Sequence, residues 1–177
     1  AGGITTAGQA TIKSADAFCT SLGYETCYGD TDSLYLKCPV DIYSQVDEIY
    51  NNNCKYGATI TDTIDKYKYL LKAKLKYWTS MVEITMKQMS QLSEQLSDHM
   101  LSFNSTNFIN LSYEEVLFPT GLLGKKKYFG TPHLKNVNFG FSEESIDFII
   151  DNLVLTNSFN ESSLNKIMTE TKLDLFI

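Results

Sequence analysis

The sequence predicts an α+β fold, in which helices and short antiparallel strands follow one another along the chain. Apolar residues recur at helical spacing in residues 4–22 and 61–103. Strand-like apolar runs flank an acidic turn in residues 24–38, and a second pair of such runs lies in residues 111–130. With 177 residues, 43% of them hydrophobic, the chain is long enough to bury a core.

Local signals set the expected bounds of each element. Gly23 should end the first helix, and the Asn-rich run "NNNCKYG" is typical of a loop. In chain order we expect a helix over 4–22, a hairpin over 24–38, a short helix over 41–50, a loop over 51–57, a long helix over 61–103 with at most one break, two strands around a Pro-Gly turn within 111–130, and a helix from Ser142 onward.

The charge pattern argues against a general nucleic-acid coat protein, because the net charge is -6. The fifteen basic residues are all Lys. Several of them lie in "DKYKYLLKAKLKYW", residues 65–78. We interpret this stretch as the solvated face of the long helix, with a functional basic patch as the alternative.

The four cysteines indicate free thiols in a reducing compartment. They are Cys19, Cys27, Cys38 and Cys54, and no two of them have the C-x-x-C spacing of a zinc or redox site. No signal peptide is visible, and no apolar run is long enough to cross a membrane. We therefore expect an intracellular protein that is neither secreted nor membrane-bound.

The tip of the hairpin over 24–38 carries two acidic residues, Asp30 and Asp32, separated by Thr31. Two carboxylates that converge on a turn repel each other unless a cation lies beside them. Oxygen ligands favour Mg²⁺, which proteins usually hold through one or two carboxylates together with phosphate oxygens. The pattern therefore points to phosphoryl or nucleotidyl transfer.

Other interpretations of the same turn fit its residues to different degrees. Asp favours turns for purely structural reasons, so an ordinary acidic turn is one alternative. A calcium-binding EF-hand loop does not fit, because Leu34 stands where a further acidic residue is needed. The nucleophile loop of haloacid-dehalogenase phosphatases is a further alternative, but this loop has Thr at the position where Leu34 stands here.

Three signatures, in the expected order, resemble family B DNA polymerases. "YGDTDS", Tyr28 to Ser33, resembles motif C of that family. "LSYEEVLFPTGLLGKKKYFG", residues 111–130, resembles the strand pair that leads from the palm to the thumb, and "ITTAGQ", residues 4–9, resembles the helix after motif B. The stretch "EEVLFPTGLLGKKKYFGTPH", residues 114–133, is similar to polymerases of large DNA viruses of eukaryotes.

The resemblance implies an architecture and a reaction. Residues 1–139 would be the C-terminal part of a palm domain, an antiparallel hairpin with helices, and residues 140–177 the beginning of a helical thumb. The reaction would be template-directed deoxynucleotidyl transfer to a primer 3′-hydroxyl with two Mg²⁺ ions. Template–primer DNA and deoxynucleoside triphosphates would be its partners, in the nucleus or at a cytoplasmic replication site.

Residue roles at the hairpin tip follow from the same resemblance. Asp32 would bind both metal ions, together with a carboxylate of motif A, and Asp30 would be a supporting acid. Gly29 would permit the turn. Thr31 would support the turn, and Tyr28 and Ser33 would pack in the hairpin or face the primer, without a chemical role.

The Lys-rich turn "GKKKYFG" would contact the new duplex. A solvated charge run is the alternative interpretation of this turn. A phosphate-binding loop does not fit, because its GK[ST] spacing is absent. By resemblance to the K-K-R-Y motif, Lys125, Lys126 and Lys127 would bind backbone or minor-groove atoms regardless of sequence, and Tyr128 would contact the primer strand or pack. Lys127 replaces an Arg of the motif, which keeps the charge but loses the planar fork.

Other parts of such a polymerase are not among these residues. Motif A, motif B and a proofreading exonuclease all lie N-terminal to motif C in the family, and no basic stretch occurs in "LTNSFN", residues 155–160. We therefore expect a fragment of a larger enzyme, inactive alone, whose N-terminal polymerase and exonuclease regions lie elsewhere. A decayed, non-catalytic remnant that at most binds nucleic acid is the alternative.

Overall fold

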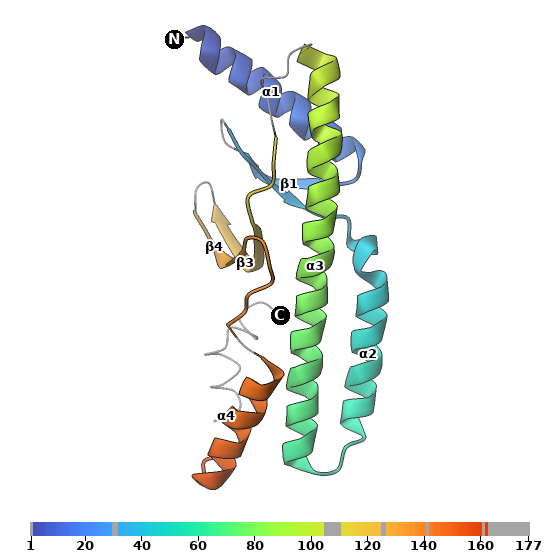
Figure 1. Ribbon diagram of the computed structural model, residues 1–177, viewed down its shortest axis with the longest axis vertical. Helices are drawn as coiled ribbons and strands as arrows, with labels where there is room; N and C mark the ends of the chain where they lie inside the picture. The colour runs from blue at the N-terminus through green and yellow to red at the C-terminus, as the bar shows by residue number, and fades with distance from the viewer. Residues whose placement is uncertain are drawn as a thin grey trace. The chain divides into compact units, whose positions relative to one another are not determined.

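The computed structural model describes residues 2–29, 32–104, 111–124, 127–140, 142–160 and 162. Helices and two antiparallel hairpins make an α+β fold, as the sequence predicts (Figure 1). The elements are α1 (Gly2–Ser21), β1 (Glu25–Gly29), β2 (Leu34–Lys37), the 3-10 helix η1 (Val40–Tyr43), α2 (Ser44–Ala58), α3 (Thr63–Asn104), β3 (Val116–Gly124), β4 (Lys127–His133) and α4 (Glu143–Leu155). Among the residues described, no helix is both long and apolar enough to cross a membrane.

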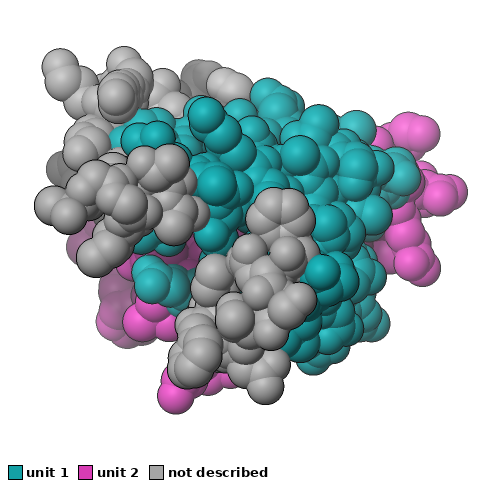
Figure 2. Space-filling model, turned by 90° about the horizontal axis from the view of Figure 1, so that it is seen from above, with its two compact units in different colours: residues 1–42, 84–114 teal, residues 43–83, 115–177 magenta. Residues whose placement is uncertain are grey.

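The chain divides into two compact units, which Figure 2 shows in teal and magenta. Unit 1 comprises residues 1–42 and 84–114, and unit 2 comprises residues 43–83 and 115–177. The predicted long helix is confirmed as α3, which is unbroken and contributes residues to both units. The predicted boundary between palm and thumb at residues 139 and 140 stays a prediction.

Unit 1 is built from α1, the β1–β2 hairpin and the C-terminal part of α3. Phe18 of α1 stacks on His99 of α3 with ring centroids 4.4 Å apart, and the Ser14 hydroxyl lies 3.4 Å from Nε2 of the same histidine. The core of the unit contains Ala15, Cys19, Tyr24, Cys38, Met86, Leu92, Leu96 and Met100. Burial of these side chains stabilises the platform from which the hairpin projects.

The end of α1 is fixed by local sequence. Gly23 has φ +90°, a left-handed conformation that side chains other than that of glycine rarely adopt. The Gly23 N–H donates to the Thr20 carbonyl, and the Tyr24 N–H donates to the Cys19 carbonyl. This pair of bonds is a Schellman motif, which ends the helix where the sequence predicts and directs the chain into β1.

Unit 2 is built from α2, the N-terminal part of α3, the β3–β4 hairpin and α4. Its core centres on Leu71 and Leu75 of α3 against Ile146 and Ile150 of α4. The predicted helix after Ser142 is confirmed for Glu143–Leu155, and the Ser142 hydroxyl caps it by accepting from the Ser145 N–H. Residues beyond 162 lie outside the described part.

The prediction of a loop at "NNNCKYG" is wrong, because these residues lie inside α2. Contacts with α3 explain the difference. The Tyr69 hydroxyl donates to the Asn53 side chain over 3.0 Å, and the rings of Tyr56 and Tyr69 meet edge to face. Gly57 is buried so closely that an added Cβ would lie 2.4 Å from Leu70 Cδ2. Packing against α3 therefore outweighs the weak helix propensity of the Asn run.

The predicted Pro-Gly turn is also wrong in position, because Pro119 and Gly121 lie within β3. The register moves from Leu117 opposite Pro132 to Thr120 opposite Gly130, so β3 contains one extra residue there. This bulge accommodates Pro119, which has no N–H to donate. The strands instead turn between Gly124 and Lys127.

The lysines of α3 do not form a simple solvated face. Lys68, Lys72 and Lys76 lie one turn apart and pair with Asp151, Asp147 and Glu143 of α4 at 2.5, 2.7 and 3.1 Å. Lys74 is only 6% exposed and lies over the Trp78 ring, so the prediction of solvation is wrong there. The stretch thus joins α3 to α4, and each exposed pair contributes about 0.2–1 kcal/mol.

Candidate functional site: the tips of two hairpins

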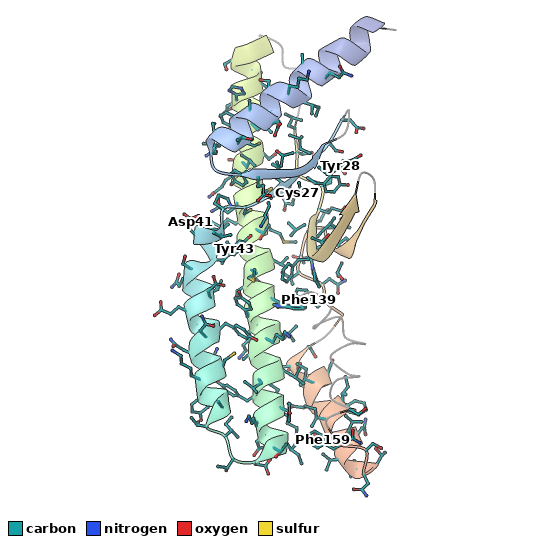
Figure 3. All side chains as sticks on the ribbon, turned by 180° about the vertical axis from the view of Figure 1, so that it is seen from behind. Cys27, Tyr28, Asp41, Tyr43, Phe139 and Phe159 are labelled. Atoms are coloured by element: carbon teal, nitrogen blue, oxygen red, sulfur yellow. The ribbon has the colours of Figure 1, made fainter. Side chains whose placement is uncertain are left out.

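The β1–β2 hairpin holds the predicted acidic turn at its tip. Its register pairs Thr26 with Leu36, Tyr28 with Tyr35 and Gly29 with Leu34, so Cys27 is the extra residue of a β-bulge. Figure 3 labels Cys27 and Tyr28 on this strand. The bulge increases the local twist just before the turn, a device that commonly re-aims side chains beside active sites.

The tip presents Asp32 and Ser33 to solvent, both exposed directly before β2. Gly29 supports the turn because it has no Cβ. A Cβ at this position would lie 3.2 Å from Leu34 Cδ2, which is closer than most such contacts. Tyr28 also has a supporting position, with its ring centroid 5.9 Å from that of Tyr35 across the hairpin. Asp30 and Thr31 lie outside the described residues. The structure therefore describes one of the two predicted carboxylates, and that carboxylate is accessible.

Asp32 fits a magnesium site as one part of it. An exposed carboxylate supplies the hard oxygen donors that Mg²⁺ prefers. Within the described ranges, no group of three or more His, Cys, Asp and Glu side chains could hold a metal ion. A two-ion site would therefore need carboxylates in addition to the described ones.

The base of this hairpin is tied to α1. The Thr26 hydroxyl donates a hydrogen bond to the Asp16 carboxylate. Cys38, which follows β2, is buried, and the Tyr24 hydroxyl lies 3.5 Å from the Gln88 side chain of α3. Contacts on both sides thus hold the strands while their tip stays exposed.

All four cysteines are free thiols, as predicted. Cys27 is exposed beside the candidate site, yet partial burial and the nearby Glu25 raise the pKa of its thiol. Burial and Asp16 raise the pKa of Cys19 to about 11. Both thiols are therefore protonated at neutral pH and are poor nucleophiles or metal ligands.

The second predicted site lies on the β3–β4 hairpin. Lys127 and Tyr128 begin β4, where their backbones pair with Gly124 and Leu122 of β3. Lys125 and Lys126 lie outside the described residues. A second register shift, between Leu122 and Gly124, inserts another extra residue into β3 near this tip. Each of the two bulges increases the local twist of the hairpin.

The structure brings Tyr28, Gly29, Asp32 and Ser33 together on one hairpin of unit 1, and it places Lys127 and Tyr128 on one hairpin of unit 2. A cavity of about 500 Å³ in unit 2 is lined by α2, α3 and the start of α4, with residues that include Tyr50, Tyr77 and Glu143. None of the predicted site residues lines it, so the cavity has no part in the candidate site.

No sequence motif points to His133, the one buried histidine of the described part. The only sequence signal for it is a lone ionisable residue at the end of an apolar strand, which is usually an ordinary core residue. Its two ring nitrogens are both engaged within unit 2, a fact that only the coordinates reveal.

Comparisons with known proteins identify relatives that are named as viral DNA polymerases. The chain is 39% identical over 143 residues to "DNA polymerase beta" of African swine fever virus isolate Tick/Malawi/Lil 20-1/1983. It is 38% identical over the same length to the proteins of that name in isolates Pig/Kenya/KEN-50/1950 and Tick/South Africa/Pretoriuskop Pr4/1996. The alignments cover 81% of this chain.

The chain spans only 11% of the length of these curated relatives. No protein-family model matches it. No solved structure matches it either. The chain is thus a homologue of a short part of a viral DNA polymerase.

Proposed function

We propose that these residues belong to a family B DNA-directed DNA polymerase, with residues 1–139 in its palm and residues 140–177 at the start of its thumb. The observation that carries the proposal is the hairpin bearing "YGDTDS", whose tip exposes Asp32. The likeness to viral DNA polymerases over 143 residues supports the same reaction class. Template–primer DNA and deoxynucleoside triphosphates are the proposed partners, and a replication site in the nucleus or cytoplasm is the proposed location.

Asp32 is the proposed metal ligand of this chain, and Asp30 is its supporting acid. When bound, two Mg²⁺ ions activate the primer 3′-hydroxyl and neutralise charge on the triphosphate. Asp32 would supply negative oxygen to that site from an exposed and anchored turn. A further carboxylate would come from a motif A elsewhere in the complete protein.

Lys125, Lys126 and Lys127 are the proposed duplex contacts, with Tyr128 beside them. Lys127 and Tyr128 lie in the first residues of β4, directly after the turn. Ammonium groups bind phosphates through charge, and minor-groove acceptors are similar in every base pair. Binding through this turn would therefore be independent of sequence.

Replacing Lys126 with Ala in the complete protein is expected to weaken primer–template binding equally on all sequences. One phosphate contact fewer should lower the slope of log Kd against log salt by about 1. Fluorescence anisotropy on templates of different sequence, at several salt concentrations, measures both effects. Lys55→Ala, which removes an exposed lysine from α2, serves as the control with an unchanged slope. A loss confined to one template sequence would contradict the proposed contact.

Residues 1–177 on their own are expected to lack polymerase activity. The proposed site needs the motif A carboxylate and the nucleotide-binding helix of motif B, and neither motif is among these residues. A primer-extension assay with the purified chain, beside the complete protein as the positive control, tests this. Measurable extension by the chain alone would show that the proposed division of the site is wrong.

A further inference from the structure

His133 ends β4 and is fully buried, with an exposed fraction of 0%. Its Nε2 lies 2.8 Å from the Phe118 carbonyl oxygen, which can only accept a hydrogen bond, so Nε2 carries the proton. Its Nδ1 accepts from the Asn138 backbone N–H over 2.9 Å. The ring is therefore a neutral imidazole in the Nε2–H form, and both nitrogens have partners.

The bond to Phe118 falls where the ladder of the β3–β4 hairpin is irregular. Phe118 and Pro119 lie between the paired residues Leu117 and Thr120, where the register shifts. Because Pro119 cannot donate, β3 lacks one ladder donor at this level. The His133 side chain supplies a donor from β4 to β3 at this same level. The imidazole thus adds a bond between the two strands at the bulge.

The bond to Asn138 ties the hairpin to the segment that leads into α4. Phe139, the next residue, packs edge to face on His133 with ring centroids 4.6 Å apart. Phe139 also packs 6.0 Å from the Trp78 ring of α3, where Figure 3 labels it, and Phe118 lies 5.3 Å from that ring. His133 therefore joins β3, β4 and residues 138–139 within one aromatic cluster anchored on α3.

We propose that His133 is a positioning residue for the Lys-rich turn at the other end of β4. This inference rests on the proposed function, in which that turn contacts the primer–template duplex. Lys127 lies six residues from His133, roughly 20 Å along an extended strand. A small change of angle at the base is therefore amplified at the turn. By fixing the base, His133 sets the direction in which the backbone of β4 leads from that base to Lys127, its first residue.

Three substitutions in the complete protein separate the two bonds. His133→Gln keeps a donor near the position of Nε2, His133→Asn keeps an acceptor near that of Nδ1, and His133→Phe keeps an aromatic ring but loses both bonds. For His133→Phe we expect the Kd for primer–template to rise roughly tenfold, because the Phe118 carbonyl and the Asn138 N–H lose their partner and the base of β4 is no longer fixed. The slope of log Kd against log salt should also fall. The incorporation rate at saturating DNA should stay within about twofold, since only binding depends on the turn. His133→Gln should restore most of the affinity, because it preserves the bond across the bulge.

A stability control separates positioning from general loss of folding. Ile150→Ala destabilises the same unit without touching His133, and thermal denaturation measures the loss for every variant. If Ile150→Ala raises the Kd as much as His133→Phe does, or if His133→Gln behaves like His133→Phe, the positioning role is overturned. If His133→Phe does not fold, the comparison of the Gln and Asn variants decides, since positioning predicts tighter binding for Gln.

The same assays distinguish failure of this inference from failure of the proposed function. If the unsubstituted protein does not bind primer–template, or if Asp32→Asn leaves incorporation intact, the proposed function is wrong and the inference is overturned with it. If the protein binds and Asp32→Asn abolishes incorporation, but His133→Phe changes neither Kd nor salt slope, only the positioning role is wrong.

Discussion

Asp32→Asn in the complete protein is expected to lower the rate of nucleotide incorporation by roughly a thousandfold or more. Asn keeps the shape of the exposed side chain but removes a negative charge from the proposed metal site. The developing charge of the transition state would then lose several kcal/mol of stabilisation, and each ~1.4 kcal/mol is a factor of ten in rate. Single-turnover incorporation at saturating DNA and nucleotide measures this loss directly.

Asp30→Asn should cost less, since its proposed role is supporting. Folding should be unchanged or slightly easier in both variants, because two neighbouring carboxylates repel each other when no cation is bound. Asp98→Asn is the matched control, since it removes an exposed carboxylate from α3 in the same unit. The catalytic interpretation of the turn would not survive near-normal incorporation by Asp32→Asn, or a loss that merely follows unfolding in a thermal scan.

Ile150→Ala is expected to destabilise unit 2 by about 2–5 kcal/mol, the range for removing most of a large apolar side chain from a packed core. Ile150 is 0% exposed and packs in the cluster that joins α4 to α3. Hydrogen exchange should show lost protection in α4 and in residues 63–83 of α3. Thermal denaturation gives the corresponding decrease in stability.

Leu155→Ala is the control for that experiment. Leu155 lies on the same helix but is 82% exposed, so its truncation should change stability by less than about 0.5 kcal/mol. Equal losses for the two variants would mean that the apolar cluster between α3 and α4 does not hold the unit together. The ion pairs of Lys68, Lys72 and Lys76 would then have to carry the contact, and stability would fall steeply with salt.

Local signals were sufficient to predict two helix ends and the first of the two candidate hairpins. Gly23 ends α1 and Ser142 begins α4 through hydrogen bonds to residues a few positions away, which a sequence specifies directly. The β1–β2 hairpin follows from apolar runs on either side of an acidic turn. The place of Asp32 at an exposed tip could therefore be predicted without coordinates.

By itself, then, the sequence determined the α+β class, the acidic hairpin and the resemblance to a polymerase, because these depend on periodicity, turn chemistry and motifs. Only the tertiary structure decided that the Asn run of α2 is helical, that Pro119 lies in a strand, and that Lys74 is buried. It also decided the bonding of His133. For the Asn run and for Pro119, contacts distant in the sequence, with Tyr69 and with β4, outweigh local preferences on the order of 1 kcal/mol per residue. Lys74 lies over the Trp78 ring, and the His133 ring bonds Phe118 and Asn138, and local propensity specifies neither arrangement.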